Sequence, residues 1–235
     1  MIKVSKLSKT FFGKHGAVSA LKGVSFEVQP GQVFALLGPN GSGKTTTLNI
    51  LSKLLEPDSG SFEVLGRIPN DPGYFDGISF MSGDSELYWA FAVKLSLNFY
   101  AELHGVDWSI VERLLKDFGA DGLIARPWMA LSNGEKTKIR LVQCLMTSPK
   151  VLFLDEPTVG LDPDIADTVR TKLKELNAKG LTLFLTSHYM KDVDSLASQV
   201  AFIKSGSIIE IADRASFGSL DDIEQRFIRL AREGR

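Results

Sequence analysis

The sequence predicts an α/β fold in which a mainly parallel sheet lies between helices, and two observations carry this prediction. Short continuous apolar runs rich in Phe and β-branched residues recur along the chain, which is typical of strands covered on both faces. Segments with helical spacing of apolar residues lie between these runs, and such alternation defines the α/β class. The predicted buried strands are VFALL (33–37), VLFL (151–154), LTLFLTS (181–187) and VAFI (200–203).

Two further segments predict a smaller β layer beside the main sheet. VSFEV (24–28) and SFEVLG (61–66) have the pattern of half-exposed antiparallel strands. Between them, the segment that follows a glycine-rich loop has apolar residues at helical spacing, which predicts a helix directly after the first buried strand. These residues are Leu48, Leu51 and Leu55.

The middle and the end of the chain are predicted to be helical. Residues 86–147 carry helical spacing and few strand signals, which indicates an inserted helical subdomain. We therefore expect one domain over 1–235, with its core formed by about 1–85 and 148–235. A last amphipathic helix is expected from Ser219, with Ile223, Phe227 and Leu230 on its apolar face.

Length and composition limit the possible functions. A chain of 235 residues with 44% hydrophobic content can bury a substantial core. Acidic and basic residues nearly cancel, at 28 against 27, so no global basic field favours nucleic-acid binding. The single cysteine, Cys144, fits a reducing compartment. Because no signal peptide and no run near the ~20 apolar residues of a membrane span is present, we expect a cytoplasmic chain.

A phosphate-binding motif follows the first predicted buried strand. GPNGSGKT matches the pattern G-x-x-x-x-G-K-[ST] between a strand and a helix, which is the context that this motif requires. Its glycines let backbone N–H groups surround phosphate oxygens, and the helix start adds partial positive charge. Lys44 would reach the β and γ phosphates of ATP, and Thr45 would bind Mg²⁺. The candidate residues of this P-loop are Gly38, Pro39, Asn40, Gly41, Ser42, Gly43, Lys44, Thr45 and Thr46.

Two other buried strands end in residues suited to the same chemistry. Asp155 closes the strand at 151–154, so its carboxylate would emerge at the carboxyl end of the sheet, where α/β proteins bind ligands. It is the candidate Mg²⁺ ligand, while Glu156 is the candidate base that polarises an attacking water. His188 follows the strand at 181–187 and could donate to a phosphate oxygen.

A second helix start, LSNGE (131–135), raises a separate question. Ser132 and Glu135 form an S-x-x-E capping box, so a well-capped helix is one interpretation. Asn133 and Gly134 favour another, because close backbone approach at the glycine suits a bound phosphate. Since the P-loop already surrounds the chain's own phosphates on one side, we expect residues 131–135, here called the signature segment, to face the nucleotide of another subunit.

The ordered motifs GPNGSGKTT, LSNGE, LFLDEP, GLDP and TSH resemble the nucleotide-binding subunit of ATP-binding cassette (ABC) transporters across essentially the whole chain. This resemblance implies a head-to-tail dimer that encloses two ATP molecules. It implies that Ser132 and Gly134 contact the γ phosphate of the partner's ATP and that Asp162, in GLDP, lies across the interface. Glu156 would be the hydrolytic base and His188 the switch histidine.

The resemblance also implies an aromatic residue that stacks on adenine, and one position departs from the family pattern. Phe11 is the closest match for the aromatic residue, with Phe12 as a rival. Gly83 stands where the family usually has a glutamine that touches Mg²⁺ and the attacking water. This departure puts the coupling route and the hydrolysis rate in question. Hydrolysis is still expected, because the four residues that would carry it are in place: Lys44, Asp155, Glu156 and His188.

The resemblance implies partners as well. A transmembrane permease subunit would hold the chain at the inner face of the cell membrane, and the functional pair would be a homodimer or a heterodimer with a related ATPase subunit. The aromatic cluster Tyr88, Trp89 and Phe91 is interpreted as subdomain core, or alternatively as a groove for a short helix of the permease. The short C-terminal tail favours an exporter ATPase of the ABC-2 type.

Two alternative functions stay open at this point. A chromosome or repair ATPase would carry a long coiled coil between the P-loop and LSNGE, and a ribosome-acting relative would carry two cassettes. A non-hydrolysing ATP-sensing module is favoured only by Gly83.

Overall fold

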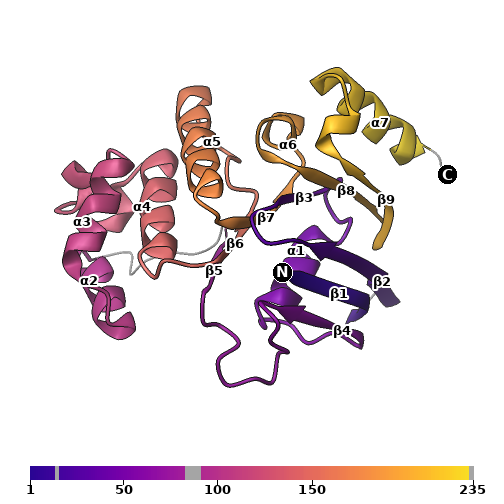
Figure 1. Cartoon of the computed structure of the whole chain (residues 1–235), viewed down its shortest axis with the longest axis horizontal. Coiled ribbons are helices and arrows are strands. Elements are labelled where there is room, and N and C mark those ends of the chain that lie inside the picture. Colours follow the sequence, from indigo (N-terminus) through magenta and orange to yellow (C-terminus); the bar gives the residue numbers. More distant parts are fainter. Residues whose placement is uncertain (14–15, 83–90, 233–235) are drawn as a thin grey trace.

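A computed structural model describes residues 1–13, 16–82 and 91–232 and contains two sheets (Figure 1). The larger sheet has the strand order β5-β6-β7-β3-β8-β9, and its first five strands are parallel, whereas β9 runs antiparallel to β8. The α/β class and all four predicted buried strands are therefore confirmed. The strands are β3 (Val33–Leu37), β5 (Ile78–Met81), β6 (Val151–Asp155), β7 (Thr182–Ser187), β8 (Gln199–Lys204) and β9 (Ser207–Asp213).

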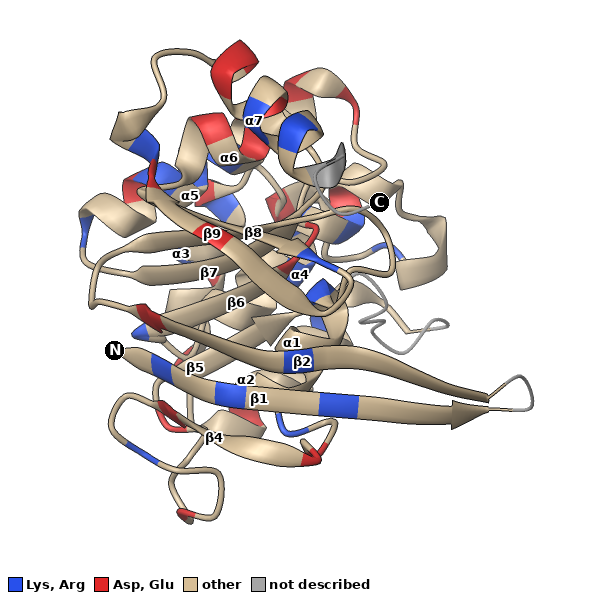
Figure 2. Cartoon of the chain, turned by 90° about the vertical axis from the view of Figure 1, so that its right-hand side faces the viewer, with Lys and Arg blue, Asp and Glu red and all other residues tan. Residues whose placement is uncertain are grey.

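The smaller sheet is the expected antiparallel layer. It has the order β2-β1-β4, formed by β1 (Ile2–Gly13), β2 (Gly16–Val28) and β4 (Ser59–Val64). Strands β1 and β2 run together as a long ribbon that projects beyond β4 (Figure 2). The sequence did not predict β1, because its lysines and its irregular register after Val4 obscure the two-residue period.

Some of the helices form a lobe at one side of the main sheet, and others pack on the faces of the sheet. Helices α2 to α4 make up the lobe (Figure 1) and lie inside the range expected for the helical subdomain. Helix α1 ends at Leu51, so the predicted continuation to Leu55 is wrong. The helices are α1 (Lys44–Leu51), α2 (Val93–His104), α3 (Trp108–Asp117), α4 (Asn133–Leu145), α5 (Pro163–Ala178), α6 (Met190–Leu196) and α7 (Leu220–Arg232), with 3₁₀ turns at Asp121–Leu123, Trp128–Ala130 and Arg214–Ser216.

Each buried strand supplies side chains to two cores, which explains its continuous apolar sequence. In β3, Val33, Ala35 and Leu37 pack with the helical lobe and helices α5 to α7, whereas Phe34 and Leu36 pack with α1 and the antiparallel layer. The second core is rich in stacked aromatic rings, and the Phe34 and Phe184 centroids lie 5.5 Å apart. The main sheet is thus packed against a hydrophobic core on each of its two faces.

The strand order determines which loops meet at the carboxyl edge of the sheet. Strand β7 pairs with β3 on one side and with β6 on the other, with Ser187 opposite Leu37 and Thr186 opposite Asp155. The three segments that follow these strands therefore emerge side by side. No helix among the described residues is long and apolar enough to cross a membrane.

Candidate active site

The P-loop lies too close to the strands behind it for larger side chains at its key glycines. A Cβ on Gly38 would lie 2.4 Å from the Ile203 carbonyl oxygen, and one on Gly43 would lie 2.7 Å from that of Ala20. Gly43 also has a φ of 110°, a conformation that residues with a Cβ rarely adopt, directly before α1 begins at Lys44. These glycines allow the tight turn that directs backbone N–H groups inward.

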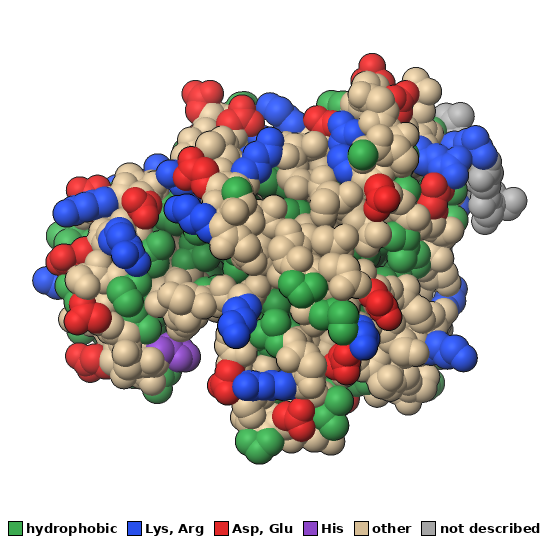
Figure 3. Space-filling view, viewed as in Figure 1, with side chains coloured by type: hydrophobic (Ala, Val, Ile, Leu, Met, Phe, Trp, Pro, Cys, Tyr) green, Lys and Arg blue, Asp and Glu red, His purple; other side chains and the backbone are tan. Residues whose placement is uncertain are grey.

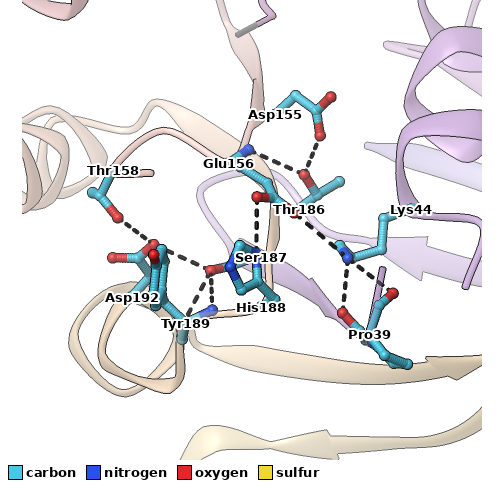
Figure 4. Close-up of polar contacts among 11 residues, drawn as sticks. Pro39, Lys44, Asp155, Glu156, Thr158, Thr186, Ser187, His188, Tyr189 and Asp192 are labelled. Carbon is cyan, nitrogen blue, oxygen red and sulfur yellow. Dashed lines mark hydrogen bonds and ion pairs between the residues drawn. The ribbon is translucent and has the colours of Figure 1, made fainter. Parts of the chain in front are cut away.

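Lys44 lies over its own loop. Its Nζ donates to the carbonyl oxygens of Gly38, at 2.7 Å, and Pro39, at 3.2 Å, and lies 3.5 Å from Glu156 Oε1 (Figure 4). The Ser42 hydroxyl is buried and has no hydrogen-bond partner in the described part of the chain. A charged donor and an orphaned hydroxyl in one loop fit a ligand rich in acceptor oxygens, such as a phosphate chain.

A hollow of about 280 Å³, here called the P-loop pocket, opens beside this loop. Phe11 reaches it from β1, whereas the neighbouring Phe12 does not line it and is 85% exposed. Successive strand residues point to opposite faces, so only one of the two aromatic rings can face the pocket. The pocket is lined by Phe11, Ala20, Asn40, Gly41, Gly43, Lys44, Thr45, Thr46 and Glu156.

Thr186, which the sequence analysis missed, fixes both acidic residues at the end of β6. Its hydroxyl donates to Asp155 Oδ1 and accepts from the backbone N–H of Glu156 at 3.1 Å. The Glu156 backbone has a φ of 47°, a left-handed conformation that costs free energy in a residue other than glycine. The fully buried Thr186 therefore holds a strained acidic residue in place.

The Glu156 carboxylate lies between the side chains of Lys44 and His188. Its Oε2 is 2.8 Å from His188 Nδ1, although this contact is not aligned as a hydrogen bond, and its Oε1 faces Lys44. The P-loop lysine, the acidic strand end and the histidine thus come from three different strand ends and meet at one point (Figure 4). This is the arrangement that the sequence led us to expect.

The signature segment forms the predicted capping box. Ser132 Oγ accepts from the Glu135 N–H at 3.3 Å, and Glu135 Oε2 accepts from the Ser132 N–H at 2.8 Å. This second hydrogen bond is the largest cause of a lowered pKa of the Glu135 carboxyl, and Arg126 adds to it. Neither Ser132 nor Gly134 lines the P-loop pocket of its own chain.

The start of α4 faces a second hollow beside the site. This cleft, of about 450 Å³, is lined by Asn133, Lys136 and Arg140 from α4 and by Asp155 and Glu156 from the end of β6. The signature helix therefore lies near the acidic strand end of the same chain, and its first residue, Asn133, lines the cleft, whereas Ser132 and Gly134 do not.

Gly134 has a packing role that the sequence analysis did not foresee. A Cβ at this position would lie 2.5 Å from Cδ1 of Ile165 in α5, so the helices pack closely here. We expect Gly134→Ala to destabilise the fold by about 1 kcal/mol, at the low end for overpacking, since the Ile165 methyl group can turn away.

A double-mutant cycle isolates this contact from changes in helix propensity. Ile165→Val removes only Cδ1, so the Gly134→Ala/Ile165→Val chain should be more stable than the sum of the single effects by about 1 kcal/mol in urea unfolding. Strictly additive effects would show that Ile165 is not the reason for glycine here.

The remaining predicted residues fall into two groups. Asp162 is exposed and occupies the N-cap position of α5 without a side-chain cap bond. Gly83, Tyr88 and Trp89 lie outside the described residues. Phe91 is described and is 47% exposed, so it is not a core residue.

The residues present fit a metal ion that is completed by a nucleotide. In the described chain, no cluster of three His, Cys, Asp or Glu side chains could hold a metal ion. Mg²⁺ at phosphate sites commonly uses one or two protein oxygens together with phosphates and waters. The exposed Thr45 at the start of α1 and Asp155 at the end of β6 provide such oxygens.

A glycine-cradled lysine at the start of a helix, with acidic residues at a nearby parallel strand end, defines the class of P-loop nucleoside triphosphatases. Within this class, the family model described as ABC transporter matches residues 21–159. The chain belongs to the ABC transporter family, and the prediction of an ABC-type ATPase is confirmed at the level of that family.

Individual relatives agree with this assignment. The chain is similar to the ABC transporter ATP-binding protein NatA of Bacillus subtilis, at 31% identity over 88% of this chain and 88% of the relative. The solved structure of cbiO1 from Clostridium perfringens, part of the ABC transporter complex cbiONQ, matches with a TM-score of 0.79 at 28% identity, covering 99% of this chain and 96% of that one.

Other relatives are much longer. ATP-binding cassette sub-family A member 9 of Mus musculus is 34% identical over 88% of this chain, which spans only 13% of that protein. Relatives at comparable identity are named both as import and as export ATP-binding proteins.

Proposed function

We propose that this chain is the ATP-hydrolysing subunit of an ABC transporter and that it powers transport through a separate permease. The observation that best supports hydrolysis is the placement of Glu156 between Lys44 and His188 at the edge of the P-loop pocket. A module that only senses ATP would not need a strained carboxylate held at this point by a buried threonine.

Each residue at the meeting point has a role in this proposal. Lys44 leaves its own loop carbonyls to bind the β and γ phosphates, and Glu156 accepts a proton from the attacking water. His188 donates to the γ phosphate. Thr45 and Asp155 would hold Mg²⁺, which neutralises charge on the phosphate oxygens when bound.

The signature segment indicates how the site is completed. Ser132 and Gly134 do not line the P-loop pocket of their own chain. We propose that a second subunit, either another copy or a related ATPase, places its own α4 start against that phosphate. Asp162 would lie in the same interface.

The proposed adenine contact gives a prediction with a built-in control. Because Phe11 lines the P-loop pocket and Phe12 does not, Phe11→Ala should weaken ATP binding by about 2- to 10-fold through loss of one aromatic stacking contact. Phe12→Ala should leave the dissociation constant within about twofold of wild type, measured by calorimetric titration. Equal weakening in both variants, or weakening in Phe12→Ala alone, would assign the stacking role differently.

We propose that the permease binds along the edge strand β5. A groove of about 790 Å³ lies between this strand and the helical lobe (Figure 3) and is lined by Phe80, Tyr100 and His104 among others. Leu95, Phe99 and Leu103 are each more than 50% exposed on α2 beside it. An apolar segment of the permease would cover these side chains.

This partner would place the chain at the inner face of the cell membrane, and we retain export as the proposed direction. The similarity to NatA, a transporter ATP-binding protein at 31% identity, supports the transport function but not a direction. Coexpression with a candidate permease, purification of the complex and ATPase assay in lipid vesicles would test the proposal. We expect substrate-stimulated phosphate release, and a complex that forms but never transports or hydrolyses would contradict it.

A further inference from the structure

Helix α6 carries a fully buried carboxylate, Asp192, close to the site (Figure 4). Its Oδ2 accepts from the Thr158 hydroxyl at 2.6 Å and lies 3.1 Å from the Ser187 hydroxyl. Its Oδ1 accepts from Arg170 Nε at 2.7 Å. Since a buried charge is tolerated only when it is paired and hydrogen-bonded, this arrangement accounts for the burial of Asp192.

Arg170, the charge partner of Asp192, also contacts a residue at the protein surface. Arg170, on α5, also donates to Asp167 at 2.6 Å, and Lys191 lies 3.4 Å from Asp167. Asp167 is exposed, so this outer part of the network is accessible to mutation without direct disturbance of Thr158 or Ser187.

The two hydroxyl groups belong to the segments that carry Glu156 and His188. Thr158 follows Glu156 by two residues, and Ser187 directly precedes His188. The Ser187 hydroxyl also accepts from the Tyr189 N–H at 2.9 Å, and its single proton can go to Asp192 or to the Tyr189 carbonyl, at 3.2 Å. A charged acceptor is the stronger of these two choices.

The sheet alone does not fix these segments. The pairing of β6 with β7 ends at Asp155 and Thr186, one residue before Glu156 and two before His188. The Glu156 N–H still donates to Thr186, and beyond that contact Asp192 joins the two segments through the Thr158 and Ser187 hydroxyl groups. The Glu156 to His188 separation of 2.8 Å depends on the relative position of these segments.

We propose that Asp192 is a positioning residue that sets the separation of Glu156 and His188 during hydrolysis. This inference rests on the proposed roles of those two residues. Asp192 does not touch the P-loop pocket, so it acts on the step that uses Glu156 and His188 and not on nucleotide affinity.

The test uses the two hydroxyl links, because their removal leaves the ion pair of Asp192 with Arg170 in place. Thr158→Val removes the hydroxyl group at nearly constant shape, Thr158→Ser keeps it, and Ser187→Ala removes the second link. We expect kcat to fall about 10-fold in Thr158→Val and in Ser187→Ala, in the range for a displaced catalytic geometry. The ADP dissociation constant should stay within about twofold, and Thr158→Ser should restore kcat.

Asp167→Asn is the matched control, since it weakens the outer contact of Arg170 and should leave kcat and ADP binding unchanged. Urea unfolding of each variant separates lost stability from lost positioning. If Thr158→Val and Ser187→Ala keep wild-type kcat, or if kcat falls only together with ADP affinity and stability, Asp192 has a structural role only. A wild-type chain that hydrolyses no ATP would refute the proposed function instead.

Discussion

Replacement of Glu156 by glutamine should lower steady-state phosphate release by about 100- to 10,000-fold, the range for loss of a general base. Glutamine has nearly the same shape and can still contact Lys44 and His188, which lie at 3.5 Å and 2.8 Å from the two carboxylate oxygens. It cannot accept a proton from the attacking water. The expected result is therefore a chain that folds and binds ATP but hardly turns it over.

Phosphate release from the purified protein measures this effect directly. Glu175→Gln is the matched control, because Glu175 pairs with Lys172 on the exposed face of α5 and its replacement should leave the rate unchanged. Equal rates for Glu156→Gln and wild type would mean that another group activates the water, and the assignment of the base would be wrong.

The main sheet could be predicted because its strands are covered on both faces. VFALL (33–37) and VLFL (151–154) are continuous apolar runs for that reason, and their ends in the sequence agree with the structure to within one residue. Strands β1, β5 and β9 were missed. β5 is only four residues long, β9 has one antiparallel partner at the edge of the sheet, and β1 mixes lysines with register shifts.

The candidate site also contains residues that the sequence predicted and residues that it did not. Lys44, Asp155 and Glu156 were predicted because each belongs to a short local motif that follows a buried strand. Thr186 and Asp192 were not predicted, because their contacts join residues that are 31 and 34 positions apart. Nothing in the local sequence distinguishes them from other polar residues near the end of a strand or in a helix.

Gly134 is an intermediate case. Its place in LSNGE predicted a phosphate contact, while the structure places it against Ile165 in the same chain. The two reasons are compatible, because Ile165 occupies the side-chain position of Gly134, whereas a phosphate contact would use the backbone N–H at the helix start. Only an assembly of two chains can separate them.

The second large effect expected is dimerisation controlled by ATP. Each chain holds a P-loop pocket that lacks the signature segment of its own α4, so ATP with Mg²⁺ should join two chains at two such pockets. Wild-type protein would pass through this state briefly, because hydrolysis removes the γ phosphate that joins the subunits. Glu156→Gln should accumulate it.

Lys44→Ala supplies the matched control for this expectation. Lys44 is the charged group of the P-loop, and its loss should prevent productive binding of the β and γ phosphates. A Glu156→Gln/Lys44→Ala chain should therefore stay monomeric at ATP concentrations that convert Glu156→Gln to dimer. Dimerisation of both chains would mean that contact between them does not depend on the nucleotide.

Sedimentation velocity of Glu156→Gln with and without ATP and Mg²⁺ tests the central claim most directly. The shared-site arrangement predicts a monomer without nucleotide and a stable dimer with it. Ser132→Asp keeps an N-cap acceptor for α4 but adds a carboxylate at the helix start that is expected to face the partner's phosphate, and it should abolish the shift. A Glu156→Gln chain that binds ATP yet remains monomeric at every protein concentration, alone and with its permease, would contradict the claim that two subunits share each nucleotide.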